Sequence, residues 1–403
     1  MKRLFILLLI VVPMSLGLFS MALAQNQVNG NNSIVSDKLI FPLVDQHVHS
    51  SCFVELPNGD FLVVWFQGSG ERTANDVQVM GARLKKGASQ WSKPFPMADT
   101  PGLPDCNPVI FLNNSGKLFL VWIAVLADRW ESSILRVRTS VDYNNDGAPV
   151  WNWQDNIFFK PGEEFPNEFE AKKDLIIKPE SEPVERFQKL KDHILEMSHN
   201  FGDRSIGWMT RIHPIILENG RILLPLYSDG LHTSMVAISD DDGQTWRSSL
   251  PIIGLGIQPT LSVRKNGDIV AFMRNAAGEP DTIWRSLSKD NGESWEGGTK
   301  TDMPAIASVE LDVLKDGRWI YVATDVETGR YRISLYVSHD EGKTWHYGET
   351  LVYDPEKRDR YSYPCVRQTK DGMINVTFSC HLHSVGEKRC SIKHVTIDPA
   401  KLP

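Results

Sequence analysis

Six segments of the chain share one pattern of apolar and polar positions. Each has an apolar strand, a short polar turn that contains glycine, and a second apolar strand. Turns such as Lys265-Asn266-Gly267 between apolar runs are typical of β-hairpins. The segments are Ser50–Phe66, Asn107–Ile123, Arg211–Tyr227, Gln258–Arg274, Ser308–Thr324 and Tyr363–Cys380. The pattern therefore predicts an all-β chain built from six similar hairpins.

A second repeat, S-x-D-x-G-x-[T/S]-W, follows three of these hairpins. It occurs at residues 239–246, 288–295 and 338–345, so the copies start 49 and then 50 residues apart. A fixed period of this length is typical of repeat architectures. Ser and Asp side chains hold a tight turn by bonding backbone N–H groups, and Trp buries a large apolar area. We interpret these Asp-boxes as structural turns that identify the fold, and not as ligand sites.

The two repeats together predict a six-bladed β-propeller with four strands in each blade. We expect the N-terminal strand near Leu39–Leu43 to close the ring by joining the last blade. The turn glycines Gly116 and Gly220 lie 104 residues apart, about twice the other intervals. The excess falls at about residues 160–203, where Val184–Ser198 has apolar residues at helical spacing. This partly helical insertion either covers the site or is a surface elaboration.

The N-terminus has the pattern of an export signal. Lys2 and Arg3 precede the apolar run Leu4–Leu23, and Ala22-Leu23-Ala24 is a small-x-small cleavage site. We expect a signal peptide at 1–24, a linker at 25–37, a propeller at 38–403, and a secreted or periplasmic protein. The alternative is a permanent anchor, since the run is nearly long enough to span a membrane. No second run of that length follows, so we expect no stable membrane insertion after signal removal.

Composition narrows the function classes. The 403 residues carry a formal net charge of −7, which argues against a general nucleic-acid binder. Five cysteines leave at least one unpaired. Cys380 and Cys390 could pair across a hairpin, or all could be buried free thiols. No Cys or His spacing is typical of a zinc site, so we expect no metal or cofactor. His47, His49, His381 and His383 would still place pairs of imidazoles on one strand face.

Counting back from the turn glycines gives a candidate site. The innermost strand of each propeller blade begins near the central axis, so residues nine or ten before each glycine should converge. They are His49 or Ser50, Asn107, Arg211, Gln258, Ser308 and Tyr363, with Arg274 and Arg330 nearby. A convergent set of polar and cationic groups predicts a binding pocket. Structural ion pairs or strand-start hydrogen bonds are the alternative for each of them.

The Asp-boxes and three phrases give the chain a family resemblance. HSSCFVELPNGDFLVVWFQGSGE, GIQPTLSVRKNGDIVAFMRN and YPCVRQTKDGMINVTFS resemble strand pairs of the non-viral sialidases and their BNR-repeat relatives. In that family three arginines bind the sugar carboxylate, and a Tyr activated by a Glu is the nucleophile. The resemblance implies that Tyr363 is the nucleophile and that Arg274 and Arg330 belong to the arginine triad. Arg211 and Asn107 would be further substrate-binding residues.

Two positions depart from the family pattern. His49 stands in place of the first triad arginine, and Gln258 stands in place of the Glu that partners the Tyr. An amide cannot accept a proton as a carboxylate does, and an imidazole lacks the planar guanidinium fork. The acid/base residue falls in the loop after the first hairpin, where Glu71 and Asp76 are both candidates.

Three functions remain open at this point. The first is a glycoside hydrolase of the exo-α-sialidase type acting on a terminal acidic sugar, and it is the one that the resemblance implies. The second is a polysaccharide lyase on uronate-containing glycans, in which His49 removes a proton and Tyr363 protonates the leaving oxygen. The third is a glycan-binding propeller without catalysis. In each case the expected partner is an acidic glycan or oligosaccharide.

Overall fold

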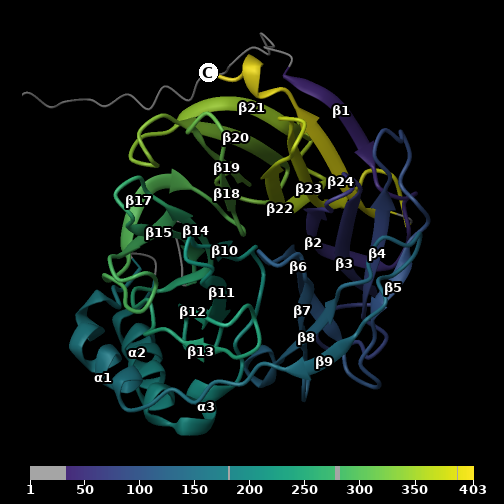
Figure 1. The fold of residues 1–403 in the computed structure, drawn as a ribbon. Coiled ribbons are helices and arrows are strands. Elements are labelled where there is room, and N and C mark those ends of the chain that lie inside the picture. The colour runs from purple at the N-terminus through teal and green to yellow at the C-terminus, as the bar shows by residue number, and fades with distance from the viewer. Residues whose placement is uncertain (1–32, 180–181, 277–281, 388) are drawn as a thin grey trace, which may run out of the picture. The chain divides into compact units, whose positions relative to one another are not determined.

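The computed structural model describes residues 33–179, 182–276, 282–387 and 389–403. The predicted signal peptide, and the predicted linker up to residue 32, lie outside the described residues. The described chain forms six four-stranded antiparallel sheets arranged around a common axis, as Figure 1 shows. The predicted six-bladed β-propeller is therefore confirmed.

Each blade takes its four strands almost in sequence order, with the first strand nearest the axis (Figure 1). Blades 1 to 3 contain β2 His47–Glu55, β3 Phe61–Gly68, β4 Gln78–Leu84 and β5 Phe95–Ala98; β6 Asp105–Leu112, β7 Leu118–Ala124, β8 Ile134–Ser140 and β9 Trp153–Asn156; and β10 Ile215–Ile216, β11 Ile222–Ser228, β12 Thr233–Ser239 and β13 Arg247–Ser248. Blades 4 to 6 contain β14 Gly256–Val263, β15 Ile269–Asn275, β16 Thr282–Ser288 and β17 Thr299–Pro304; β18 Glu310–Val313, β19 Trp319–Ala323, β20 Arg332–Ser338 and β21 His346–Tyr353; and β22 Arg360–Gln368, β23 Ile374–His381, β24 Cys390–Ile397 and β1 Ile34–Leu39. All six predicted hairpins are present as the first two strands of a blade.

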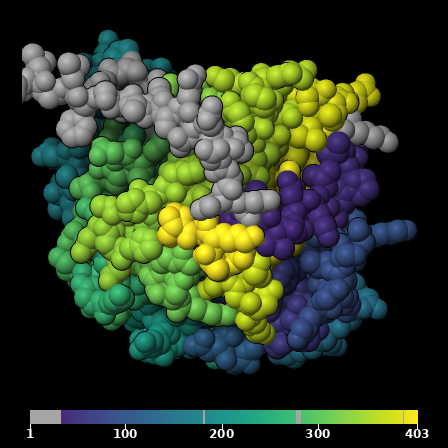
Figure 2. Space-filling model, turned by 90° about the horizontal axis from the view of Figure 1, so that it is seen from above, coloured from purple at the N-terminus to yellow at the C-terminus, as the bar shows by residue number. Residues whose placement is uncertain are grey.

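The ring is closed by β1, which pairs antiparallel with β24 in register Lys38↔His394. The pairing continues beyond the strand, since Ile40 N donates to Ile392 O over 2.8 Å. Figure 2 shows the purple N-terminal segment beside the yellow C-terminal segment. The predicted closure is confirmed, but the strand begins at Ile34, inside the predicted 25–37 linker.

The Asp-boxes join neighbouring blades. In the first box Ser239 Oγ accepts a hydrogen bond from Gly243 N over 2.9 Å, and Asp241 Oδ1 accepts one from Thr245 N over 2.8 Å. Gly243 has φ +85°, and a Cβ there would lie 2.5 Å from the Phe119 ring on β7 of the preceding blade. Glycine is therefore needed both for the turn and for close packing between blades. The interpretation of the boxes as structural turns is confirmed.

The insertion contains α1 Glu164–Lys172, α2 Val184–His199 and α3 Phe201–Ser205. The predicted helix at 184–198 nearly coincides with α2, but the prediction of one helix missed α1 and α3. Figure 1 places the helices beside β12 and β13 of blade 3, outward from the axis, which favours the surface-elaboration alternative. Short 3-10 helices lie at Trp130–Ser132, Lys173–Leu175 and Pro399–Lys401. Within the described ranges no helix has the length and apolar character needed to cross a membrane.

The predicted cysteine pair is not formed. The register of β23 and β24 places Cys380 opposite Ser391 and His381 opposite Cys390, so the two thiols are offset by one position. All five cysteines are buried and free. The alternative of buried free thiols therefore holds.

Candidate functional site

Four inner strands have the same irregularity at the same level. Strands β2, β6, β14 and β22 each shift register near the position nine residues before the turn glycine. The residues there have positive φ: Ser50 +60°, Asn107 +49°, Gln258 +55° and Tyr363 +58°. Positive φ in a residue with a side chain is strained, and such strain clusters at functional sites. A bulge also changes the direction in which side chains point. The residues nine positions before the turn glycines in these four blades therefore share one irregular backbone conformation at the same height along the propeller axis.

Tyr363 lies at the centre of the predicted residues. The His49 ring stacks against the Tyr363 ring with centroids 4.2 Å apart. The guanidinium carbons of Arg211 and Arg330 lie 4.7 and 5.8 Å from the Tyr363 ring centroid. Gln258 Nε2 donates to the Tyr363 hydroxyl over 3.1 Å. The structure therefore brings His49, Arg211, Gln258, Arg330 and Tyr363 together.

The arginines at this centre carry unused donors. Arg211 is almost fully buried, and Nη2 donates to Pro364 O over 2.7 Å, while Nε and Nη1 have no partner within the described ranges. In the described part of the chain no salt bridge forms at Arg211, Arg274 or Arg330. Burial lowers the pKa of Arg330, and the charges of Arg274 and Arg360 lower it further. The centre is thus a cluster of positive charge without an ion-paired carboxylate.

His49 is a buried imidazole. Burial lowers its pKa well below the ordinary value, and the charges of His381 and His47 act in the same direction. Its Nδ1 has no hydrogen-bond partner among the described residues. The ring centroids of His47 and His381 lie 5.6 and 5.7 Å from that of His49. Of the four histidines considered in the sequence, three are therefore neighbours here, and no ring contact with them is found for His383 in the described ranges.

The two acid/base candidates have different surroundings. His47 Nε2 lies 3.0 Å from Glu71 Oε1, and the hydrogen bond from His47 lowers the pKa of Glu71, as does the charge of Arg330. Asp76 is exposed, and its carboxylate accepts from Ser69 N and from Ser69 Oγ at 2.7–3.1 Å. Glu71 therefore lies near the arginines, whereas Asp76 holds the turn of its own loop.

The remaining ring positions are also buried. Asn107 Nδ2 donates to the Tyr227 hydroxyl over 3.1 Å. Ser308 is fully buried and its Oγ has no partner among the described residues. Asn107 therefore reaches the site through Tyr227, a residue that the sequence analysis did not select.

Two further residues join the site. Burial and the charges of Asp229 and Tyr363 raise the pKa of Tyr227 well above the ordinary value. Burial also raises the pKa of Asp229, although the charge of Arg274 opposes this. Tyr227 lies seven residues after Gly220, and Arg274 lies seven residues after Gly267. Counting seven residues forward from each turn glycine would therefore have selected Tyr227 as well. Asp229 lies two residues further on and has no such signal.

Comparison with known proteins places the fold. The sequence profile of the BNR repeat-like domain matches residues 59–165 and 204–376, which is more than half of the chain. A protein of unknown function from Dyadobacter fermentans has a TM-score of 0.65 at 16% identity, covering 90% of this chain and 98% of that one. The K499G mutant of the NanB sialidase from Streptococcus pneumoniae has a TM-score of 0.64 at 12% identity, covering 92% and 71%.

A third similar structure, the α-L-arabinanase of Penicillium chrysogenum complexed with arabinobiose, has a TM-score of 0.58 at 15% identity, covering 92% and 99%. At these identities the similarity shows the fold alone. The match to the sequence profile lies on both sides of the helical insertion and includes all six turn glycines, four of them with both flanking strands. The chain belongs to the BNR repeat-like domain family, and its fold is that of the sialidase-like β-propellers.

Proposed function

We propose that this protein is a glycoside hydrolase of the sialidase type that acts on a terminal sugar bearing a carboxylate. The observation that supports this most directly is the pair of guanidinium groups over the Tyr363 ring, from Arg211 and Arg330, with Nε and Nη1 of Arg211 lacking partners among the described residues. Buried donors without partners are costly, and a carboxylate accepts fork-shaped hydrogen bonds from guanidinium groups. A bound acidic sugar would therefore neutralise the cluster and satisfy the free donors of Arg211.

The same geometry suggests roles in hydrolysis. The Tyr363 hydroxyl would attack the anomeric carbon, since a neutral nucleophile is not repelled by the sugar carboxylate. Gln258 donates to that hydroxyl and cannot take its proton. The Tyr363 proton would instead pass to Nδ1 of the adjacent His49, which has no partner among the described residues. The charges of Arg211 and Arg330 over the ring would stabilise the negative charge that develops during attack. Asp229, whose pKa is raised, would serve as the general acid, and Glu71 is the alternative.

A second candidate is a polysaccharide lyase on a uronate, and His49 favours it. A base must be unprotonated at working pH, and burial lowers the pKa of His49, whose Nδ1 has no partner among the described residues. In this reaction His49 would take the proton at C5 of the uronate while the arginines neutralise its carboxylate. Tyr363, stacked on His49, would protonate the leaving oxygen.

The site of action is also part of the proposal. The pattern of a positive start, an apolar run and Ala22-Leu23-Ala24 supports export to the periplasm or the medium. Extracellular glycans would be accessible to an exported enzyme. Mass spectrometry of the N-terminus of protein recovered from the expressing cells and their medium would test cleavage after Ala24.

The experiment that separates the candidates is a product assay with sialosides and uronate-containing glycans. Tyr363→Phe removes the hydroxyl of the site, and Tyr353→Phe, at an exposed tyrosine, is the matched control. Release of sialic acid or another saturated acidic sugar, abolished only by Tyr363→Phe, would support the hydrolase. An unsaturated ultraviolet-absorbing product, lost in His49→Ala, would establish the lyase instead. Thermal stabilisation by ligand without any product would leave a binding protein and overturn both enzymatic functions.

A further inference from the structure

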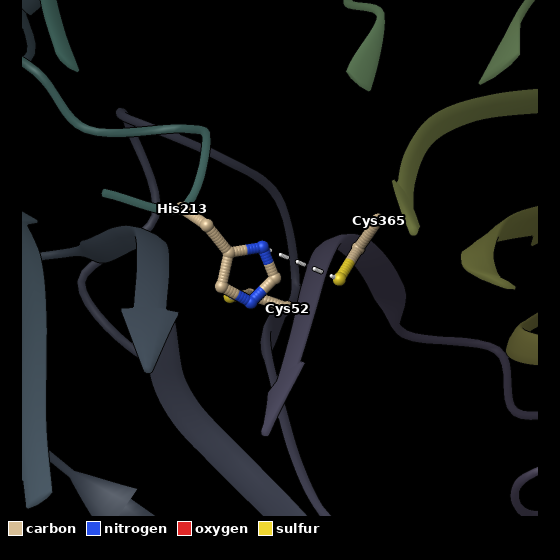
Figure 3. A group of neighbouring side chains, drawn as sticks. All are labelled: Cys52, His213 and Cys365. Carbon is tan, nitrogen blue, oxygen red and sulfur yellow. Dashed lines mark hydrogen bonds between the residues drawn. The ribbon is translucent and has the colours of Figure 1, made fainter. Parts of the chain in front are cut away.

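A second group of side chains lies one level deeper along the inner strands. Two residues after the ring positions of blades 1, 3, 5 and 6 stand Cys52, His213, Glu310 and Cys365. All four are buried, with exposed fractions of 1%, 5%, 0% and 0%. Figure 3 shows the imidazole of His213 between the two sulfur atoms. None of these four residues has a role in the proposed sugar chemistry.

The distances fit a metal site. One ligand atom from each of Cys52, His213 and Cys365 lies within 4.8 Å of the others. Cys52 Sγ is 3.2 Å from His213 Nε2, and Cys365 Sγ is 3.9 Å from His213 Nδ1. Ligands of a tetrahedral zinc ion are roughly 3.6 Å apart, given bond lengths of about 2.0–2.3 Å. Cys52 Sγ already lies beside Nε2, whereas Cys365 Sγ lies beside Nδ1, so binding one ion at Nε2 requires the Cys365 side chain to rotate towards that nitrogen.

Glu310 orients the histidine as in known metal sites. Its Oε1 lies 2.7 Å from His213 Nδ1, and its Oε2 accepts from Val366 N over 3.0 Å. A metal-bound histidine usually donates its other ring N–H to a carboxylate, which fixes the tautomer and the ring. This leaves Nε2 as the ligand atom. Nε2 is 2.8 Å from Phe53 O, so a metal ion would replace a proton that is shared with that carbonyl.

We propose that Cys52, Cys365 and His213 Nε2 bind a thiophilic metal ion such as Zn²⁺ on the axis of the propeller, with Glu310 orienting His213. Two thiolates and an imidazole are the donor set that soft and borderline ions prefer. The Phe53 carbonyl is available for the fourth position. With four protein ligands that are all buried, the site is a closed structural one and not a catalytic one.

The ion would cross-link distant parts of the ring. Cys52 lies in blade 1 and Cys365 in blade 6, the two blades that meet where the ring is closed. Tyr363 and Arg211 each precede a ligand by two residues. The ion would therefore hold both the closure of the ring and the two central residues of the candidate site. Because Cys52 and His213 are 161 residues apart in sequence, no local motif could reveal the site.

The test is the metal content of the purified protein, before and after incubation with Zn²⁺ and removal of free ion. We expect about one equivalent per chain in the wild type and at least a tenfold reduction in Cys52→Ser and in Cys365→Ser. Cys380→Ser, at a buried cysteine of blade 6 outside the group, should keep full metal content. Glu310→Gln should weaken Zn²⁺ affinity by about 10–100-fold.

Cobalt substitution of the wild type keeps the test independent of the variants. Co²⁺ bound by thiolates gives an intense ultraviolet charge-transfer band, which Zn²⁺ should abolish by displacement. Wild-type protein that is folded by circular dichroism but holds only traces of metal and gives no such band would overturn the proposal. Equal metal content in Cys52→Ser and Cys380→Ser would also overturn it. So would a Cys52–Cys365 disulfide found by mass spectrometry in the native protein, because its sulfurs would not be available as thiolates.

Discussion

Gln258 and His49 separate this site from the sialidase pattern that the sequence resembles. Both residues contact Tyr363 directly, one through a hydrogen bond to its hydroxyl and the other through its ring face. The two replacements therefore act on the same phenol. The polar contact that the family makes with a carboxylate is here made with an amide, which holds the hydroxyl but cannot deprotonate it.

Restoring the carboxylate at this position should change the rate of hydrolysis. In Gln258→Glu the new carboxylate would accept the Tyr363 proton, so we expect hydrolysis of an acidic glycoside to rise about tenfold or more. Steady-state kinetics against the wild type measures this, with the exposed Gln188→Glu on α2 as the control. Unchanged hydrolysis together with loss of an unsaturated product would instead indicate the lyase.

Ser50 allows a test of the backbone strain at the positive-φ positions of the inner strands. It is fully buried with φ +60°, and its Oγ has no partner in the described residues. Ser50→Gly removes both the backbone strain and the unsatisfied hydroxyl, and we expect the free energy of unfolding to rise by about 1–2 kcal/mol. Denaturant unfolding measures the change. Ser51→Gly, which deletes the 3.0 Å hydrogen bond to Thr377 Oγ1, should instead destabilise the protein. A less stable Ser50→Gly variant would show that the hydroxyl has a partner.

At the scale of elements, the Asp-box turn is the unit that the sequence describes most completely. The hydrogen bonds from Ser338 to Asp340, from Gly342 to Ser338 and from Thr344 to Asp340 all lie within eight consecutive residues, so the motif alone specifies the turn. Helix α2 is similar, because 16 residues of regular spacing carry their own signal. Helix α3 has five residues and begins where Asn200 Oδ1 accepts from Gly202 N and Asp203 N, too short a segment for a periodic pattern.

The box carboxylates make stability depend on pH. Burial acts to raise the pKa of Asp340, but hydrogen bonds from Thr344 and Ser338 outweigh it and lower the pKa to about 2. A lowered pKa stabilises the fold above the ordinary value of 3.8, and that stability is lost as the pH falls towards 2. Asp340→Asn should therefore cost about 1 kcal/mol at pH 7, after allowance for solvent screening, and little at pH 2.

Thermal or denaturant unfolding between pH 7 and pH 2 measures this difference. The matched control is Asp302→Asn, which makes the same change at an exposed carboxylate outside the boxes. A constant difference between the wild type and Asp340→Asn across the range would contradict a role for the ionised carboxylate.

At the scale of the molecule, β1 holds the ring together. It contributes the fourth strand of blade 6, and its residue Ile34 packs against the buried cluster that contains Val395 and Ile397. Deleting residues 1–39 would expose the edge of β24 and remove this packing. We expect the free energy of unfolding to fall by about 3 kcal/mol or more. A protein that lacks only residues 1–32 is the control, and equal stability of the two would contradict the role of β1.

The sequence predicts the six-bladed ring, but it does not predict every group of side chains that meets near the axis of the ring. Six turn glycines define equivalent positions, so Arg211, Gln258 and Tyr363 could be placed near one another before any coordinates. Asp229 has no such equivalent position. Cys52, His213 and Cys365 do hold equivalent positions, two residues after the ring positions, but their contact depends on packing between blades. Their side chains meet only across the axis of the propeller, and no local sequence pattern indicates that these residues of different blades are in contact.

Strand β1, which closes the ring, also limits the order in which the blades can be completed during folding. During synthesis β1 leaves the ribosome before every other strand of the propeller, yet its partner β24 is among the last segments to emerge. Until then β1 has no edge to pair with, and blade 6 cannot be complete. A growing chain can therefore stack its early blades but cannot close the ring before β24 has emerged, and the edge of β1 stays unpaired until then.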